Sequence, residues 1–172
     1  YKIYLNLIGK IQVKNILMAI IAANNSGIEF KKILKILPRI TSVEGRLEKI
    51  GKIHNNSKVI LDYAHTPAAL ESALSNLKEQ FPLNKINLIF GCGGDRDFKK
   101  RSLMGKIAEK YSNEIYLTDD NPRNEKPFEI RNEIKKGIKN KRIHEIPDRK
   151  KAIQEAVKNL QTGDILLVAG KG

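Results

Sequence analysis

Two loops of this sequence gather residue types that can bind a small charged molecule. Residues 119–123, DDNPR, place two carboxylates, an amide and a guanidinium directly after an apolar segment, and residues 91–97, GCGGDRD, place Arg96 after three glycines. A guanidinium pairs with a carboxylate or phosphate through parallel N–H groups, and carboxylate or amide oxygens accept from an ammonium. These groups suit a zwitterion such as an amino acid. We expect Asp95 and Asp97 to hold Arg96 in place, and the glycines to allow close backbone approach or positive φ.

Both loops also have simpler interpretations. GCGGDRD can be a tight strand-to-helix turn whose arginine pairs with its own neighbours, and DDNPR can be an Asx turn followed by a helix cap. His65 can be a capping or packing residue. Cys92 lies in the glycine loop, but no histidine or asparagine is placed to complete a triad, so we do not expect a catalytic thiol.

The segments around these loops alternate between strand and helix patterns. We expect strands at 46–50, 58–63, 86–90, 114–118 and 164–169, and helices at 67–80, 99–111, 127–139 and 148–160. Such alternation predicts an α/β fold: a Rossmann-like, doubly wound, mostly parallel sheet with helices on both faces. A short helical segment precedes it, with helices at 11–24 and 29–37. The first is apolar on nearly every face, so we expect it to be buried.

The unusual residues follow the carboxyl ends of four predicted strands. Asp62 and His65 follow the second strand, the two loops described above follow the third and fourth, and Gly170 follows the last. The turns at the opposite edge, FPLNK, YSN and LQTG, are plain in composition. Because open α/β sheets bind ligands at their carboxyl edge, we expect one composite site there.

Composition limits the classes of function. The chain has 172 residues, of which 41% are hydrophobic and 30% charged, as in an ordinary globular protein. It contains no apolar run that could cross a bilayer, no signal-peptide pattern and a single cysteine, so we expect a cytoplasmic protein without a membrane partner. The net charge is +13, but lysine and arginine are scattered and are not interleaved with aromatic residues. Nucleic acid is therefore not the expected partner.

Four segments, VILDYAHTPAALESAL, FGCGGDRDFKKRSLMG, TDDNPRNEKP and LLVAGKG, resemble in order and spacing the Mur ligases of peptidoglycan synthesis. VKNILMAIIAA and VEGRLEKI match as well, so the resemblance covers nearly all of the chain, and the branch that adds meso-diaminopimelate is the most similar. This family has a UDP-binding domain, a central ATPase domain with a P-loop and a Rossmann-like C-terminal domain. The resemblance implies that residues 1–40 are the C-terminal helices of the central domain and residues 41–172 are most of the C-terminal domain.

The resemblance further implies an ATP-dependent acid–amino-acid ligase, expected to be monomeric. In the family, the D-glutamate carboxylate of UDP-N-acetylmuramoyl-L-alanyl-D-glutamate attacks the γ-phosphate of ATP, and an amine of meso-diaminopimelate then attacks the acyl phosphate. The family's P-loop, carbamylated lysine and Mg²⁺ ligands do not occur in this sequence, nor do the histidine and glutamate that follow GKG. We therefore expect a fragment that holds no metal, supplies no catalytic residue and is inactive alone.

Residue by residue, the resemblance assigns two binding sets. For ATP, Asn15 resembles the adenine-side asparagine, Arg46 an arginine that reaches ATP on domain closure and Asp62 the ribose-binding aspartate, with His65 in the same motif. The diaminopimelate set is Arg96, Asp120, Asn121, Pro122, Arg123 and Gly170. An arginine suits the extra carboxylate of diaminopimelate, whereas it would repel the terminal ammonium of lysine.

Other interpretations remain open. A lysine-adding ligase, or a cyanophycin or folylpolyglutamate synthetase, shares part of DYAHTP but typically lacks DDNPR after GGDRD. A non-catalytic module that binds an amino acid or a nucleic acid belongs to a different class. A steep salt dependence of affinity for DNA would favour the nucleic-acid version.

Overall fold

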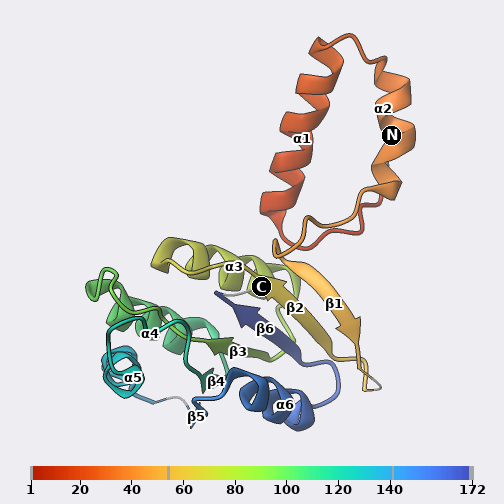
Figure 1. The fold of residues 1–172 in the computed structure, drawn as a ribbon. Coiled ribbons are helices and arrows are strands. Elements are labelled where there is room, and N and C mark those ends of the chain that lie inside the picture. Colours follow the sequence, from red (N-terminus) through yellow and green to blue (C-terminus); the bar gives the residue numbers. More distant parts are fainter. Residues whose placement is uncertain (1, 54, 141, 171–172) are drawn as a thin grey trace.

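The structure, a computed structural model, describes residues 2–53, 55–140 and 142–170. It consists of a six-stranded sheet with helices on both faces and a helical hairpin that stands apart from the sheet (Figure 1). The strands are β1 (Glu48–Lys52), β2 (Lys58–Asp62), β3 (Ile86–Phe90), β4 (Glu114–Leu117), β5 (Arg142–Glu145) and β6 (Ile165–Ala169). The helices are α1 (Lys10–Asn25), α2 (Phe30–Ile36), the 3-10 turn η1 (Leu37–Arg39), α3 (Pro67–Gln80), α4 (Lys99–Tyr111), α5 (Pro127–Lys135) and α6 (Arg149–Asn159). No helix within these ranges is long and apolar enough to cross a membrane.

The sheet has the strand order β1-β2-β6-β3-β4-β5. β1 pairs with β2 in antiparallel orientation, and all the other pairs are parallel, which confirms the predicted mostly parallel α/β sheet. β5 was not predicted. Within the described residues it is an edge strand that pairs only with β4, and its sequence RIHE carries a single aliphatic residue, Ile143, so it lacks the apolar pattern of the buried strands.

The helices cover both faces of the sheet, as predicted. α3, α4 and α5 pack on one face through residues such as Leu74, Met104 and Ile134, all of which are fully buried. α6 packs on the other face through Ala156, which joins a cluster that includes Tyr116 of β4. Asp148 caps α6, because its Oδ1 accepts from the Lys151 amide at 3.0 Å.

The prediction that the helix at 11–24 is buried was wrong. In α1 only Ile16 is buried, and it packs against Ile33 and Leu37 of the hairpin, while Leu17 and Met18 are exposed. The segment forms a helix because its residues have a high helix propensity. Within the described chain, however, only one face of the helix has a packing partner. The base of α1 contacts the sheet domain, where the Gly9 amide donates to the Gln80 side chain on α3 at 2.6 Å.

Candidate functional site

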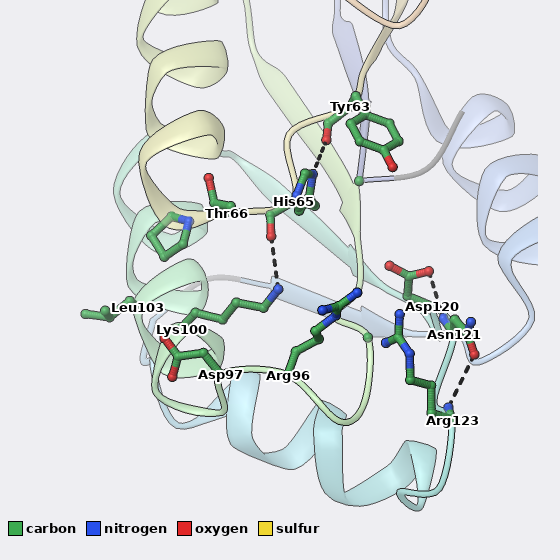
Figure 2. Close-up of a pocket in the computed structure, with 13 residues that line it drawn as sticks. Tyr63, His65, Thr66, Arg96, Asp97, Lys100, Leu103, Asp120, Asn121 and Arg123 are labelled. Carbon is green, nitrogen blue, oxygen red and sulfur yellow. Dashed lines mark hydrogen bonds between the residues drawn. The ribbon is translucent and has the colours of Figure 1, made fainter.

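A cavity of about 810 Å³ lies at the carboxyl edge of the sheet, where the loops after β2, β3, β4 and β6 meet (Figure 2). Five of the six residues predicted to bind diaminopimelate line it: Arg96, Asp120, Asn121, Arg123 and Gly170. The sixth, Pro122, does not line this cavity. The structure therefore brings the side chains of the two unusual loops to one place.

The loop after β4 is an Asx turn that also forms a wall of this cavity. The Asp120 carboxylate accepts from the Asn121 amide at 2.7 Å, and the Asn121 side chain accepts from the Arg123 amide at 3.3 Å. Arg123 adopts a left-handed backbone with φ of 49°. Asp119 does not line the cavity, because its carboxylate pairs with Arg131 of α5. The structural and the binding interpretations of DDNPR are thus compatible.

The glycines of the loop after β3 allow this loop to pack closely against the loop after β4. The Gly94 amide donates to the Asn121 carbonyl at 2.9 Å, and a Cβ at Gly94 would lie 1.9 Å from the Pro122 carbonyl oxygen. A Cβ at Gly91 would lie 2.4 Å from the Thr118 carbonyl oxygen. The expectation of positive φ is wrong for the three glycines of this loop, and Asp95 takes that conformation instead, with φ of 50°. The glycines are needed for close packing of two backbones.

Arg96 is not held by the aspartates that flank it, contrary to prediction. The Asp95 carboxylate accepts from the Asn124 side chain at 2.8 Å, and the Asp97 carboxylate accepts from the Lys99 amide at 2.9 Å. Among the described residues, the Arg96 side chain has no hydrogen-bond or ion-pair partner, and it is exposed beside the cavity. Its guanidinium is therefore available to an anionic ligand.

The loop after β2 closes another side of the same cavity. The His65 ring lies with Nδ1 3.0 Å from the Tyr63 carbonyl oxygen, and the Lys100 ammonium donates to the His65 carbonyl at 3.1 Å (Figure 2). Thr66 caps α3 by accepting from the Ala69 amide at 3.3 Å. His65 thus lies with the diaminopimelate residues rather than with the rest of the ATP set.

Sequence reasoning did not foresee Lys100 as a lining residue of this cavity. The available signal was the run KKR, which forms the first turn of α4 from Lys99 to Arg101. Cations at a helix N-terminus oppose the helix dipole, so three in succession indicate that something else stabilises them.

The other three residues of the predicted ATP set meet at a second cavity of about 420 Å³ between α1, α3 and the end of β2. Asn15 lies on α1 and Arg46 just before β1, and both are exposed. Asp62 is only 8% exposed, and its two carboxylate oxygens accept from the Leu47 and Ala64 amides, both at 2.9 Å. Burial raises the pKa of the Asp62 carboxyl, although these amide bonds and the charge of Arg46 act in the opposite direction. This cavity offers an amide, a guanidinium and an acceptor for hydroxyl groups.

Cys92 is poorly suited to nucleophilic chemistry. Its side chain is 4% exposed and lies against the Met104 sulfur at 3.6 Å, and burial raises the pKa of its thiol to about 11. A thiol with such a pKa stays protonated at neutral pH, whereas the thiolate is the reactive form. Across the described ranges, no three histidine, cysteine, aspartate or glutamate side chains gather as a metal site would require.

Comparison with known proteins identifies relatives along nearly the whole chain. The Mur ligase, glutamate ligase domain matches residues 45–172. The chain is 45% identical over 168 residues to the UDP-N-acetylmuramoyl-L-alanyl-D-glutamate–2,6-diaminopimelate ligase of Rickettsia felis, a match that covers 97% of this chain and 31% of that protein. It is 48% identical over 167 residues to the ligase of the same name from Buchnera aphidicola, covering 96% of this chain and 33% of that protein.

Solved structures agree with these sequence matches. A structure of a ligase of the same name superposes with a TM-score of 0.75 at 38% identity, covering all of this chain and 35% of that one. A folylpolyglutamate synthase from Thermotoga maritima shares the fold with a TM-score of 0.72 at 23% identity, covering 97% of this chain and 37% of that one. The chain spans about a third of the length of these relatives. Because the family domain matches most of its residues, the chain belongs to the Mur ligase family.

Proposed function

We propose that this chain is part of an ATP-dependent ligase that adds meso-diaminopimelate to UDP-N-acetylmuramoyl-L-alanyl-D-glutamate. In this proposal, residues 1–40 belong to the central ATPase domain and residues 41–172 to the C-terminal domain. We further propose that the full-length protein acts in the cytoplasm as a monomer. Family membership and relatives named for this reaction support the proposal.

The observation that carries the proposal is the pair of exposed guanidiniums, Arg96 and Arg123, at one cavity that also contains the Asp120 carboxylate and the Asn121 amide. meso-Diaminopimelate has an ammonium and a carboxylate at each end. Two arginines can take its carboxylates, while Asp120 and Asn121 can accept from an ammonium. L-Lysine lacks the second carboxylate, so one arginine would face its ammonium and repel it. We call Arg96, Asp120, Asn121 and Arg123 the amino-acid clamp.

The second cavity supports a role in binding ATP. Arg46 presents an exposed guanidinium that suits a phosphate, Asp62 can accept from ribose hydroxyls, and the Asn15 amide suits the edge of a base. Mg²⁺ neutralises phosphate charge when it accompanies ATP. The residues of this cavity do not fit a metal site, since Asp62 is its only carboxylate and is already bonded to two amides. His65 lines the first cavity and not this one.

The test is amino-acid-dependent ADP formation by the full-length protein, supplied with ATP, Mg²⁺ and the muramoyl dipeptide nucleotide. We expect strong turnover with meso-diaminopimelate and weak turnover with L-lysine. Preference for L-lysine would retain a Mur ligase but refute the role of the two arginines. No turnover with either amino acid would refute the ligase proposal and favour a binding module.

A further inference from the structure

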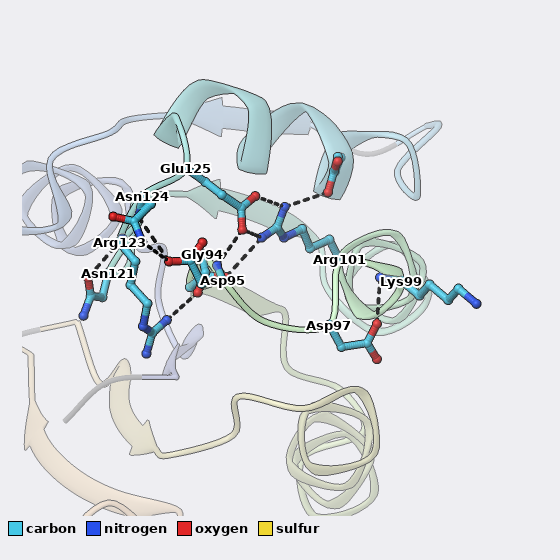
Figure 3. Close-up of polar contacts among 11 residues, drawn as sticks. Gly94, Asp95, Asp97, Lys99, Arg101, Asn121, Arg123, Asn124 and Glu125 are labelled. Atoms are coloured by element: carbon cyan, nitrogen blue, oxygen red, sulfur yellow. Dashed lines mark hydrogen bonds and ion pairs between the residues drawn. The ribbon is translucent and has the colours of Figure 1, made fainter.

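Arg101 on α4 is a buried cation that touches both loops of the amino-acid clamp. Its side chain is only 1% exposed. Nη1 and Nη2 each donate to one oxygen of Glu125 at 2.7 Å, which makes a bidentate pair (Figure 3). Nη1 also donates to Glu133 of α5 at 2.8 Å, and Nη2 donates to the Gly93 carbonyl at 3.3 Å. One guanidinium therefore contacts the loop after β3, the loop after β4 and the helix that follows.

Glu125 links Arg101 to residues that lie next to the two clamp arginines. Its Oε1 accepts from the Asp95 amide at 2.5 Å as well as from Arg101. Asp95 immediately precedes Arg96, and Glu125 follows Arg123 by two residues. The pair of Arg101 and Glu125 thus joins the two loops close to the points from which the two clamp guanidiniums extend.

Two further hydrogen bonds join the loop after β3 to the loop after β4, and they also depend on the relative position of these loops. The Asp95 side chain accepts from the Asn124 side chain at 2.8 Å, and Arg123 Nη1 donates to the Gly94 carbonyl at 2.5 Å (Figure 3). The bond with Glu125 raises the pKa of the Arg101 guanidinium, and the bond with Arg101 lowers the pKa of Glu125 to about 2. Both groups therefore stay charged at neutral pH, and the charged pair explains how a cation is tolerated at the start of α4.

We propose that Arg101 is the positioning residue of the amino-acid clamp, because its pairing with Glu125 sets the spacing between Arg96 and Arg123. This inference takes its substrate, meso-diaminopimelate, from the proposed function, whereas the role of Arg101 is argued from the geometry. Arg101 does not itself line the cavity, so it acts through the two loops. Two guanidiniums at a fixed spacing can distinguish a ligand with two carboxylates from a ligand with one.

The first test compares two matched variants of the full-length protein, Glu125→Gln and Glu133→Gln. Both remove one negative charge beside Arg101. A carboxamide at 125 has a single acceptor oxygen and cannot replace the bidentate pair, whereas at 133 one oxygen suffices for the single bond. We expect Glu125→Gln to raise the KM for meso-diaminopimelate about tenfold and to reduce discrimination against L-lysine, with the KM for ATP unchanged. We expect Glu133→Gln to leave these KM values and the discrimination within about twofold of the original protein.

A purely structural role would give a different pattern. Fewer correctly folded molecules would lower kcat equally for both amino acids and leave every KM and the discrimination unchanged. That result, or equal effects of the two variants, would overturn the inference. Arg101→Lys keeps the positive charge but loses the planar guanidinium that donates two parallel hydrogen bonds. We therefore expect its effects on KM and discrimination to resemble those of Glu125→Gln. Lys110 lies on α4, as Arg101 does, and forms an exposed ion pair with Glu71 of α3; Lys110→Met breaks that pair and serves as the control without effect.

A second readout does not depend on the substrate. Amide hydrogen exchange at Gly94 and Asp95 reports the bonds between the two loops, since these amides donate to Asn121 and Glu125. In Glu125→Gln we expect faster exchange at both amides, with exchange in β3 unchanged. Unchanged exchange at Gly94 and Asp95 would refute the positioning role even if the ligase is confirmed. Faster exchange in a protein that does not use diaminopimelate would retain that role and refute the proposed substrate.

Discussion

Replacing Arg123 by alanine should weaken the use of meso-diaminopimelate far more than the binding of ATP. The side chain is exposed at the first cavity, and its Nη1 already donates to the Gly94 carbonyl, so the rest of the guanidinium can meet a ligand. A hydrogen bond to a charged group contributes about 1.5–3 kcal/mol, and solvent exposure favours the lower end. A loss of about 1.5–2 kcal/mol corresponds to a fall of about ten- to thirtyfold in kcat/KM.

The backbone does not complicate this variant. Arg123 lies at φ of 49°, and alanine meets the same steric cost there as arginine, so folding stability should change little from the backbone alone. The loss of the bond to Gly94 adds a small effect on loop order. Lys126→Ala is the matched control, because Lys126 belongs to the same loop and carries the same charge but pairs with Glu129 at 3.6 Å and does not line the cavity.

The assay is steady-state ADP formation by the full-length protein while meso-diaminopimelate is varied at saturating ATP and dipeptide nucleotide, and then while ATP is varied. We expect Arg123→Ala to lower kcat/KM for the amino acid by the factor given above and to leave the KM for ATP within about twofold. Equal losses for the two substrates would refute the assigned role, as would an equal effect of Lys126→Ala.

Three further predictions concern the loops and the core. Gly94→Ala should lower the free energy of unfolding by about 1–3 kcal/mol in urea titrations, because its Cβ would overlap the Pro122 carbonyl; an unchanged midpoint would mean that the loops are looser than the structure shows. The folded-state pKa of Glu125, about 2, is below its ordinary value of 4.5, so its contribution to stability is present above pH 4.5 and is lost as the pH falls towards 2. Glu125→Gln should remove this part of the acid dependence in unfolding measurements at successive pH values, and an unaltered profile would contradict the pairing with Arg101. Cys92 should react slowly with iodoacetamide at pH 8 in the native protein and rapidly in urea, and fast native alkylation would contradict its burial.

The sequence was most informative where apolar periodicity decides structure. α3, α4 and β3 lie where they were predicted, because each presents a clear apolar face or a continuous buried run. β5 was missed because an edge strand with one half-exposed face needs little apolar sequence, and its pairing with β4 comes from tertiary structure. The exposure of α1 could not be predicted either, since an apolar helix indicates a surface to be covered but not what covers it.

For the site, residue types were informative and their partners were not. The types at Arg96 and Arg123 and their place after parallel strands predicted a shared edge, and both line one cavity. The aspartates beside Arg96 instead bond to Asn124 and to the start of α4, because Asp95 takes a left-handed backbone that the sequence does not reveal. Arg101 was not among the predicted site residues, since the two glutamates with which it pairs lie 24 and 32 residues away in sequence.

The central claim is that the cavity at the carboxyl edge of the sheet holds the amino acid. A crystal structure of the full-length protein with meso-diaminopimelate tests it most directly. The account predicts that the ligand lies in this cavity, with one carboxylate paired to Arg96 or Arg123 at about 2.7–2.9 Å and an ammonium facing Asp120 or Asn121. A ligand bound elsewhere, or bound here with neither arginine in contact, would contradict it.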